Sequence, residues 1–207
     1  MIGEMNMKRI VSLVIMAVMV VVLSSCNLLD STVSDIGSAL HGRPMTIQTY
    51  DVNSQVIDRI HGTAVDIRAD GKFDLKDSDG STVQKSSVLN VIVGGKVMLH
   101  VGSSLIAYGD GLENVFDQFS KTVDINNMDR STPIINRLVF QFKNLTTGHH
   151  MLILVRSQTG TPLATFIGDS ISYNSTQVDK STFFWVDGKP LFIYRCDYTV
   201  YDLGLLQ

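Results

Sequence analysis

The chain has 207 residues, of which 44% are hydrophobic and 18% are charged, with a formal net charge of −3. The slight acidic excess excludes a non-specific nucleic-acid binder, which needs a basic surface, and the apolar content excludes a disordered chain. Two cysteines exclude both a disulfide-dense scaffold and a four-cysteine zinc site. The length is that of one domain with a hydrophobic core.

The N-terminal segment has the pattern of a secretion signal. Lys8 and Arg9 form a short basic region, the apolar run 10–23 follows, and small residues lead to Cys26. The apolar run is too short to span a hydrocarbon core of about 30 Å comfortably at about 1.5 Å per residue. We therefore predict a signal peptide over residues 1–25.

The end of that segment, Leu-Ser-Ser-Cys, resembles the lipobox of bacterial lipoproteins. The resemblance implies that the Cys26 thiol receives a diacylglycerol and that a peptidase cuts before Cys26. Fatty acids such as palmitate then hold the chain on the extracellular face of the cell membrane. A plain secretory signal with a chance cysteine, or an uncleaved N-terminal anchor, are the alternatives. Residues 26–43 form a lead-in with a weak helical stripe.

Strand signals dominate from Pro44 onward. Strands are predicted over 46–50, 56–60, 63–68, 72–75, 88–93, 96–101, 151–156, 163–167, 182–186 and 189–194. In the clearest hairpin, Gly94-Gly95 joins two strands, so Val93 pairs with Lys96. Both faces of this hairpin are apolar. The face with Val97 and Leu99 is the predicted core face, and the other face carries Leu89, Val91, Met98 and His100.

Two helices are predicted among the strands. Residues 112–121 follow Asp110 as a candidate cap, and residues 133–144 begin with Pro133 at the first helical position. Apolar residues recur with helical spacing in both segments. Residues 44–207 therefore read as one α+β domain, with mostly antiparallel strands in a sheet or partly closed barrel and two short helices packed on it.

Three segments carry a resemblance to a known family. They are Met-Thr-Ile-Gln-Thr-Tyr-Asp at 45–51, Arg-Ser-Gln-Thr-Gly-Thr-Pro-Leu-Ala-Thr-Phe at 156–166, and Asp-Gly-Lys at 187–189 together with Phe-Ile-Tyr-Arg-Cys-Asp-Tyr at 192–198. Together they resemble a family of uncharacterised lipoproteins from Gram-positive bacteria, a domain of unknown function. The resemblance implies a surface lipoprotein and supplies no activity, cofactor or site residue.

The candidate catalytic residues are His100 and Cys196. A Cys-His enzyme needs a base close to the thiol. The predicted hairpin places His100 on an apolar face, and strand alternation places Cys196 on one face with Tyr194 and Tyr198, as for a small core residue. The adjacent His149 and His150 would point to opposite faces if they began a strand.

No metal or cofactor motif is present in the sequence. Asp74, Asp77, Asp79 and Gly80 superficially resemble a calcium loop, but Leu75 and Ser86 stand where that loop requires acidic ligands. A polar turn is the better interpretation, and we predict no metal ligands and no cofactor.

An aromatic stripe forms the remaining candidate site. The Asp187-Gly188 turn places Trp185 and Tyr194 on one face, which they share with Phe183, Phe192 and Tyr198. An exposed stripe could stack sugar rings, whereas a stripe covered by the 133–144 helix would be core, the outcome that the rarity of large exposed apolar patches favours. Trp185, Tyr194 and His100 are the candidate ligand-binding residues.

The absence of catalytic motifs favours a non-enzymatic binding or accessory module of unknown ligand. Its partners would be the membrane, through a lipid on Cys26, and a cell-wall polymer or a membrane protein. No nucleic acid is expected. The alternative is a small cell-envelope hydrolase that uses His100 or Cys196 with a nearby carboxylate.

Overall fold

The computed structural model describes residues 40, 42–117 and 148–206, all within one compact unit, Val33–Gln207. The first eight strands are β1 (Met45–Tyr50), β2 (Val56–Gly62), β3 (Val65–Ala69), β4 (Leu75–Lys76), β5 (Thr82–Gln84), β6 (Leu89–Val93), β7 (Lys96–His100) and β8 (Leu105–Gly109). The other six are β9 (Met151–Arg156), β10 (Pro162–Gly168), β11 (Ile171–Ser175), β12 (Ser181–Val186), β13 (Lys189–Tyr194) and β14 (Asp197–Asp202). Two 3₁₀ turns complete the elements, η1 (Gly71–Phe73) and η3 (Leu203–Leu206).

The fold is all-β over the described residues, so the α+β prediction is wrong. Of the predicted 112–121 helix, residues 115–117 are helical and residues 112–114 are not, while residues 118–121 lie outside the described residues, as does the whole of the predicted 133–144 helix. Asn114 caps this helical segment in place of Asp110, because its Oδ1 accepts a hydrogen bond from Phe116 N at 3.1 Å. No sheet in the described part of the chain closes into a barrel.

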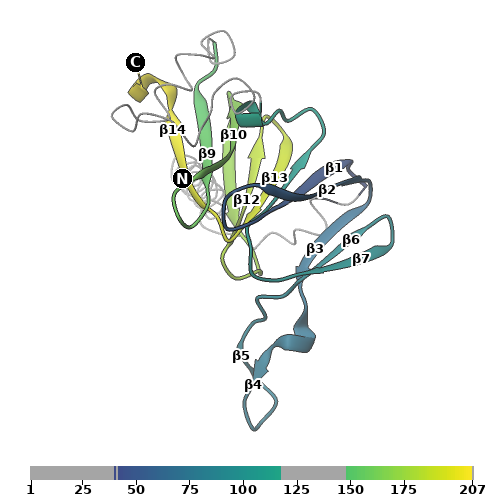
Figure 1. Ribbon diagram of the computed structural model, residues 1–207. Helices are drawn as coiled ribbons and strands as arrows, with labels where there is room; N and C mark the ends of the chain where they lie inside the picture. The colour runs from purple at the N-terminus through teal and green to yellow at the C-terminus, as the bar shows by residue number, and fades with distance from the viewer. Residues whose placement is uncertain (1–39, 41, 118–147, 207) are drawn as a thin grey trace, which may run out of the picture. The chain divides into compact units, whose positions relative to one another are not determined.

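The strands form four sheets (Figure 1). The largest has six strands in the order β11-β12-β13-β8-β1-β2, two have three strands in the orders β10-β9-β14 and β3-β6-β7, and β4 pairs with β5 alone. All pairs of neighbouring strands among these elements are antiparallel. Consecutive strands mostly pair, as short hairpin turns require.

Both faces of the six-stranded sheet are buried, which makes a three-layer arrangement. On one face, Ile47 and Phe192 share a core with Val65 and Leu89 of the β3-β6-β7 sheet. On the other, Phe184 and Ile193 share a core with Ile153, Val155 and Phe166 of the β10-β9-β14 sheet. This double burial explains why β13 is apolar on both of its faces.

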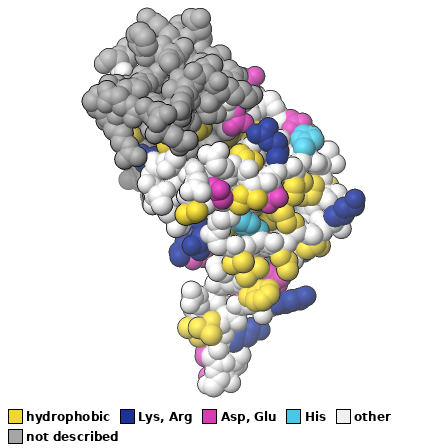
Figure 2. Space-filling model, in the orientation of Figure 1, with side chains coloured by type: hydrophobic (Ala, Val, Ile, Leu, Met, Phe, Trp, Pro, Cys, Tyr) yellow, Lys and Arg dark blue, Asp and Glu magenta, His cyan; other side chains and the backbone are white. Residues whose placement is uncertain are grey.

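The β6–β7 hairpin has the predicted register, with Val93 opposite Lys96, but its buried face is the opposite of the one predicted. Leu89 and Val91 are fully buried, whereas Val97 and Leu99 are 62% and 55% exposed. The Leu89 face packs on the six-stranded sheet. The Val97 face contributes to the exposed hydrophobic side chains (Figure 2).

Strand alternation breaks after β13, which corrects the predicted environment of Cys196 and Tyr198. Arg195 has a left-handed φ of 51°, and β14 then pairs with β9 in a different sheet. Tyr198 consequently contacts Phe184, with ring centroids 5.1 Å apart, and is separated from the Tyr194 face. None of the helical segments in the described residues is long and apolar enough to span a membrane.

Candidate functional site

Four loops meet around a cavity of about 220 Å³. Its lining comes from the β1–β2 turn (Asp51, Val52), the β7–β8 loop (102–104), the β9–β10 turn (157–159) and Arg195. Strand register brings these loops together. β8 begins at Leu105, opposite Thr49 near the end of β1 and opposite Tyr194 at the end of β13. Loops supported by a rigid sheet are a common location for binding sites.

Arg195 is fixed in the cavity wall by its backbone. Its N–H donates to Lys180 O and its carbonyl accepts from Ser104 Oγ, both at 2.8 Å. The left-handed conformation of a non-glycine residue costs on the order of 1 kcal/mol or more. The two hydrogen bonds hold the residue in this conformation, so the direction in which its side chain leaves the backbone is set by the fold.

The guanidinium of Arg195 has an unmet hydrogen-bonding need. Its Nε is buried and has no hydrogen-bond partner, and no carboxylate of the described residues forms an ion pair with it. A buried donor without a partner costs about 1–3 kcal/mol, and more when the group is charged.

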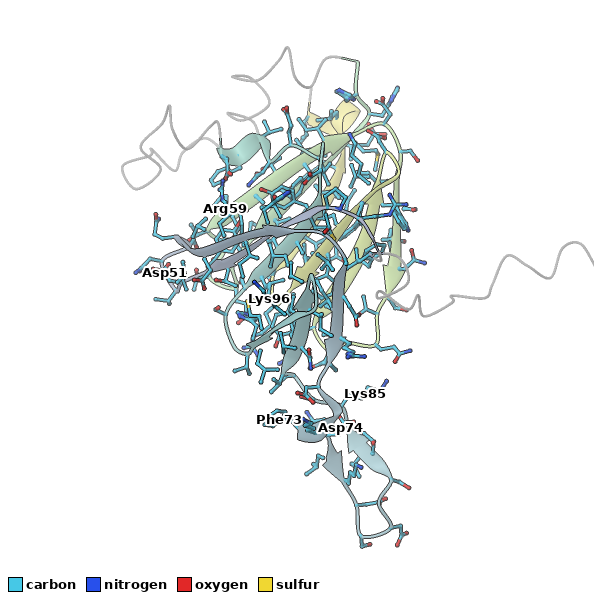
Figure 3. The ribbon with its side chains drawn as sticks, turned by 90° about the vertical axis from the view of Figure 1, so that its right-hand side faces the viewer. Asp51, Arg59, Phe73, Asp74, Lys85 and Lys96 are labelled. Atoms are coloured by element: carbon cyan, nitrogen blue, oxygen red, sulfur yellow. The ribbon has the colours of Figure 1, made fainter. Side chains whose placement is uncertain are left out.

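Asp51 lines the same cavity from the turn after β1, and Figure 3 shows it near the end of the β1–β2 pair. Its Oδ1 accepts from the backbone N–H groups of Asn53 and Gln55, each at 2.8 Å. This Asx-turn geometry fixes the carboxylate. Its Oδ2 bonds to no described residue, so it remains an available acceptor.

The β9–β10 turn supplies hydroxyl groups to the cavity. Ser157 Oγ lies 2.8 Å from Thr159 Oγ1 and accepts from Thr161 N at 3.1 Å. The turn is also closed by Ser157 N donating to Thr161 O at 2.8 Å. The cavity therefore combines one cation, one carboxylate and several hydroxyls on restrained loops.

The predicted aromatic stripe is part of the core. Tyr194 is fully buried, and its hydroxyl donates to Ser87 O at 2.5 Å. Trp185 is half-buried, with its ring 5.2 Å from that of Phe183 and the Arg43 guanidinium 5.2 Å from its centroid. A sugar-stacking platform requires both Trp185 and Tyr194 to be exposed, so the structure does not provide that platform. Side chains of β3 and β6 cover this face, and the proposed 133–144 cover lies outside the described residues.

His100 supports the cavity without lining it. Its Nε2 lies 2.9 Å from Ser103 O, in the β7–β8 loop, and its ring meets Tyr194 edge-on with centroids 5.9 Å apart. The histidine thus joins a loop of the cavity to the core. Its hydrogen-bond partner is a backbone carbonyl and not a carboxylate.

Cys196 is poorly suited to nucleophilic attack. Burial raises the pKa of its thiol to about 12, and Sγ donates to Tyr194 O at 3.2 Å. A thiol with this pKa stays protonated at neutral pH, whereas the thiolate is the nucleophile. Neither Cys196 nor His100 forms a hydrogen bond to a carboxylate within the described part of the chain. The geometry thus does not assemble the His/Cys and carboxylate site of a hydrolase there.

The acidic segment 74–79 is a polar turn, as predicted. Asp77 Oδ1 accepts from Asp79 N at 3.0 Å and from Ser81 N at 2.8 Å, and Asp74 Oδ1 accepts from Ser86 N at 2.7 Å. These carboxylates therefore organise the β4–β5 hairpin. The described residues contain no group of three or more histidine, cysteine or acidic side chains placed to hold a metal ion.

The adjacent exposed histidines before β9 share a carboxylate partner that the sequence did not predict. Nδ1 atoms of His149 and His150 lie 3.0 and 3.4 Å from the same Asp169 Oδ1. Both residues precede the strand, so they do not take opposite faces. The hydrogen bond from His149 lowers the pKa of the Asp169 carboxyl.

A buried polar network also escaped sequence reasoning. The Gln48 amide nitrogen donates to Tyr50 Oη at 3.0 Å, and its oxygen accepts from Arg59 Nε at 3.0 Å. Arg59 in turn pairs with Asp117 at 3.0 Å, and Figure 3 shows Arg59 on β2. Burial raises the pKa of Tyr50. The network joins β1, β2 and the helical residues 115–117.

A family model described as a domain of unknown function, DUF5052, matches residues 8–206, and the chain belongs to this family. The match bears out the expected membership of a family without assigned function. It does not include any statement on lipidation or bacterial source. The comparisons with curated proteins and with solved structures found no match.

Proposed function

We propose that this DUF5052 protein is a lipid-anchored module on the extracellular face of the cell membrane, and that it binds its ligand without chemical conversion. The observation that carries the binding role is the cavity that four loops build on the sheets, which Asp51, Arg195 and several hydroxyl-bearing residues line. Loops held by a rigid scaffold commonly carry binding sites, and a few polar or charged groups in a cavity supply specificity.

The anchoring part of the proposal is supported by the sequence at the N-terminus. The basic residues, the short apolar run and the Leu-Ser-Ser-Cys ending at Cys26 occur in the order that lipoprotein signals use. Each buried methylene of an acyl chain contributes about 0.8 kcal/mol, so two or more chains give stable anchoring. The lead-in to residue 43 would connect the lipid to the β domain.

The composition of the cavity supports binding in preference to catalysis. Arginine stays charged at physiological pH and does not exchange protons with a substrate. The Ser157 hydroxyl is hydrogen-bonded to Thr159 Oγ1, and none of the described residues gives it a basic partner that could activate it as a nucleophile. The arrangement therefore supplies charge and hydrogen bonds for recognition.

The anchoring claim is tested by Cys26→Ser in growing cells. Metabolic labelling with an alkynyl fatty acid should mark the wild-type chain and leave the variant unlabelled. Detergent phase separation should shift the variant from the detergent phase to the aqueous phase, because the acyl chains are lost. A variant that stays in the detergent phase would contradict the lipid anchor.

The binding role is tested by affinity capture from envelope extracts. The bait is the full chain with Cys26→Ser, compared with the same chain carrying Arg195→Gly. Glycine adopts the left-handed φ of this position freely, so the variant should keep the fold while losing the guanidinium. Lys72→Gly is the control for the loss of one cation, because Lys72 is exposed and does not line the cavity. We expect a component captured by the wild type and by Lys72→Gly and lost with Arg195→Gly. Identical capture by all three baits would contradict the proposal.

A further inference from the structure

We infer that β7 pairs edge to edge with β7 of a second copy of this chain, so that the protein forms a two-fold symmetric dimer. This inference goes beyond the proposed function and does not depend on it. It follows from three features of the β6–β7 hairpin: a free backbone edge, a row of exposed apolar side chains on that edge, and the symmetry of the row.

The outer edge of β7 has free backbone groups. Over the described residues, β7 is the last strand of the β3-β6-β7 sheet and pairs with β6 alone. The two-glycine turn between β6 and β7 has a positive φ at both residues, as in the type I′ turn of a two-residue hairpin. In that turn Val93 and Lys96 exchange both backbone hydrogen bonds, so the N–H and C=O groups of Val97 and Leu99 point away from β6. None of the described residues bonds to these groups, so they are free to pair with a further strand.

The side chains along this edge form an exposed apolar row. Val97, Leu99 and Val101 alternate along the chain, so they share one face of the hairpin. Their exposed fractions are 62%, 55% and 61%. A contiguous apolar patch beside unpaired backbone groups is the feature by which sheet edges associate.

Charges mark three other sheet edges of the described chain and are nearly absent from β7. The edge strands β2, β3 and β14 all contain aspartate, at Asp58, Asp66, Asp197 and Asp202. Charged side chains on an edge oppose pairing with another chain. β7 carries Lys96 at its first position and no acidic residue. It therefore lacks the charges that would keep a second strand away.

The apolar row is self-complementary about Leu99. In an antiparallel pair of β7 strands with a two-fold axis at Leu99, this residue faces its own copy, and Val97 faces Val101 of the second copy. Lys96 faces Gly102, beyond the end of the strand, so no two like charges meet. The outward N–H and C=O groups of Leu99 bond to those of its copy. Because an apolar side chain meets an apolar side chain at all three positions, the occupant that fits this edge is a second copy.

The size of the contact sets the strength of the dimer. A whole valine or leucine side chain has roughly 100 Å² of apolar surface. The three partly exposed side chains therefore offer about 200 Å² per copy, in addition to the backbone edge. A standard interface buries roughly 800 Å² per partner. We therefore expect a reversible dimer with a dissociation constant in the micromolar range.

Disulfide trapping tests the register. In the full chain with Cys26→Ser, Leu99→Cys places a thiol on the two-fold axis, where the Cα atoms of a hydrogen-bonded antiparallel pair lie about 5.5 Å apart, a distance that a disulfide bridges. Leu205→Cys is the matched control, because Leu205 is 77% exposed and lies in η3, outside the proposed interface. After mild oxidation with copper phenanthroline, Leu99→Cys should run as a covalent dimer on a non-reducing gel while Leu205→Cys stays monomeric. Equal cross-linking of the two variants would overturn the inference.

Sedimentation velocity tests the dimer without a cross-link. The full chain with Cys26→Ser should pass from monomer to dimer as its concentration rises to about 200 μM. Leu99→Lys brings two ammonium groups together and should weaken the dimer by at least about tenfold, whereas Leu205→Lys should leave it unchanged. Both positions are exposed, so the variants should keep the fold. An equimolar mixture of Leu99→Lys and Leu99→Glu should restore the dimer, because opposite charges then face each other across the axis.

Three results would overturn the inference. One is a chain that stays monomeric up to about 200 μM. Another is a dimer that survives Leu99→Lys, which would place self-association elsewhere in the chain. The third is a monomeric chain that binds phospholipid vesicles and loses this binding in Leu99→Glu, which would assign the apolar row to a membrane surface.

Discussion

The reversed face of the β6–β7 hairpin gives a matched pair of leucines for measuring where the core lies. Leu89 is fully buried and Leu99 is 55% exposed, although both belong to the same hairpin and lie at adjacent pairs of its register. Truncation to alanine removes three carbons from each. At about 0.8 kcal/mol per buried carbon, the transfer loss is about 2.4 kcal/mol for Leu89. The cavity left behind adds to this, so the expected loss is about 2–5 kcal/mol.

Leu99→Ala should cost less than about 1 kcal/mol, because over half of the side chain already contacts water. The assay is urea unfolding of the full chain with Cys26→Ser, followed by the fluorescence of Trp185, the single tryptophan, which packs against the core that contains Leu89. The midpoint should fall clearly for Leu89→Ala and little for Leu99→Ala, with similar slopes. Equal midpoints, or a larger effect at Leu99, would refute the assignment of the buried face.

Three further predictions concern titrating groups. Because burial raises the Cys196 pKa to about 12, its thiol should react slowly with iodoacetamide at pH 8 in the folded chain and rapidly in urea; equal rates would contradict its burial. The pKa of Asp169 is lowered by His149, so its stabilising effect is present above the unfolded carboxyl pKa of about 3.9 and is lost as pH falls through the lower folded value. His149→Ala should raise that carboxyl pKa in an NMR titration, and an unchanged value would exclude the contact. Burial raises the pKa of Tyr50, so above about pH 10 only the unfolded tyrosine ionises and the stability of the fold decreases as the pH rises. In Tyr50→Phe the urea midpoint should decrease less steeply with pH in this range. An unaltered decrease would show that another group causes it.

Strand pairing was largely readable from the sequence because turn chemistry is local. Gly94-Gly95 and Asp187-Gly188 set two hairpin registers, and both are observed, with Val93 opposite Lys96 and Val186 opposite Lys189. The choice of buried face was not readable. Both faces of the β6–β7 hairpin are apolar, so only the packing of the layers decides between Leu89 and Leu99.

The α+β prediction failed because its helical content depended on two segments. In the 112–121 segment only residues 115–117 are helical among those that the structure describes, and Leu112 and Phe116 are buried there. The 133–144 segment lies outside the described residues. Strands therefore supply nearly all of the regular structure in the described part of the chain.

The cavity was hidden in the sequence for a physical reason. Its residues come from positions near 51, 103, 158 and 195, and only the register of β1, β8 and β13 brings them together. No sequence signal marks the left-handed φ of Arg195, because the residue is not glycine. The predicted alternation of strand faces therefore ran through Arg195 without a break. The turns themselves were recognisable from their polar residues, which is the one signal that could have pointed to this end of the sheet.

The most direct measurement of the central claim is affinity capture from envelope extracts with the full chain carrying Cys26→Ser, compared with the same chain that also carries Arg195→Gly. Because Arg195 lines the cavity, the account predicts a component that the first bait captures and the second bait does not. Equal capture by the two baits would contradict the binding role of the cavity.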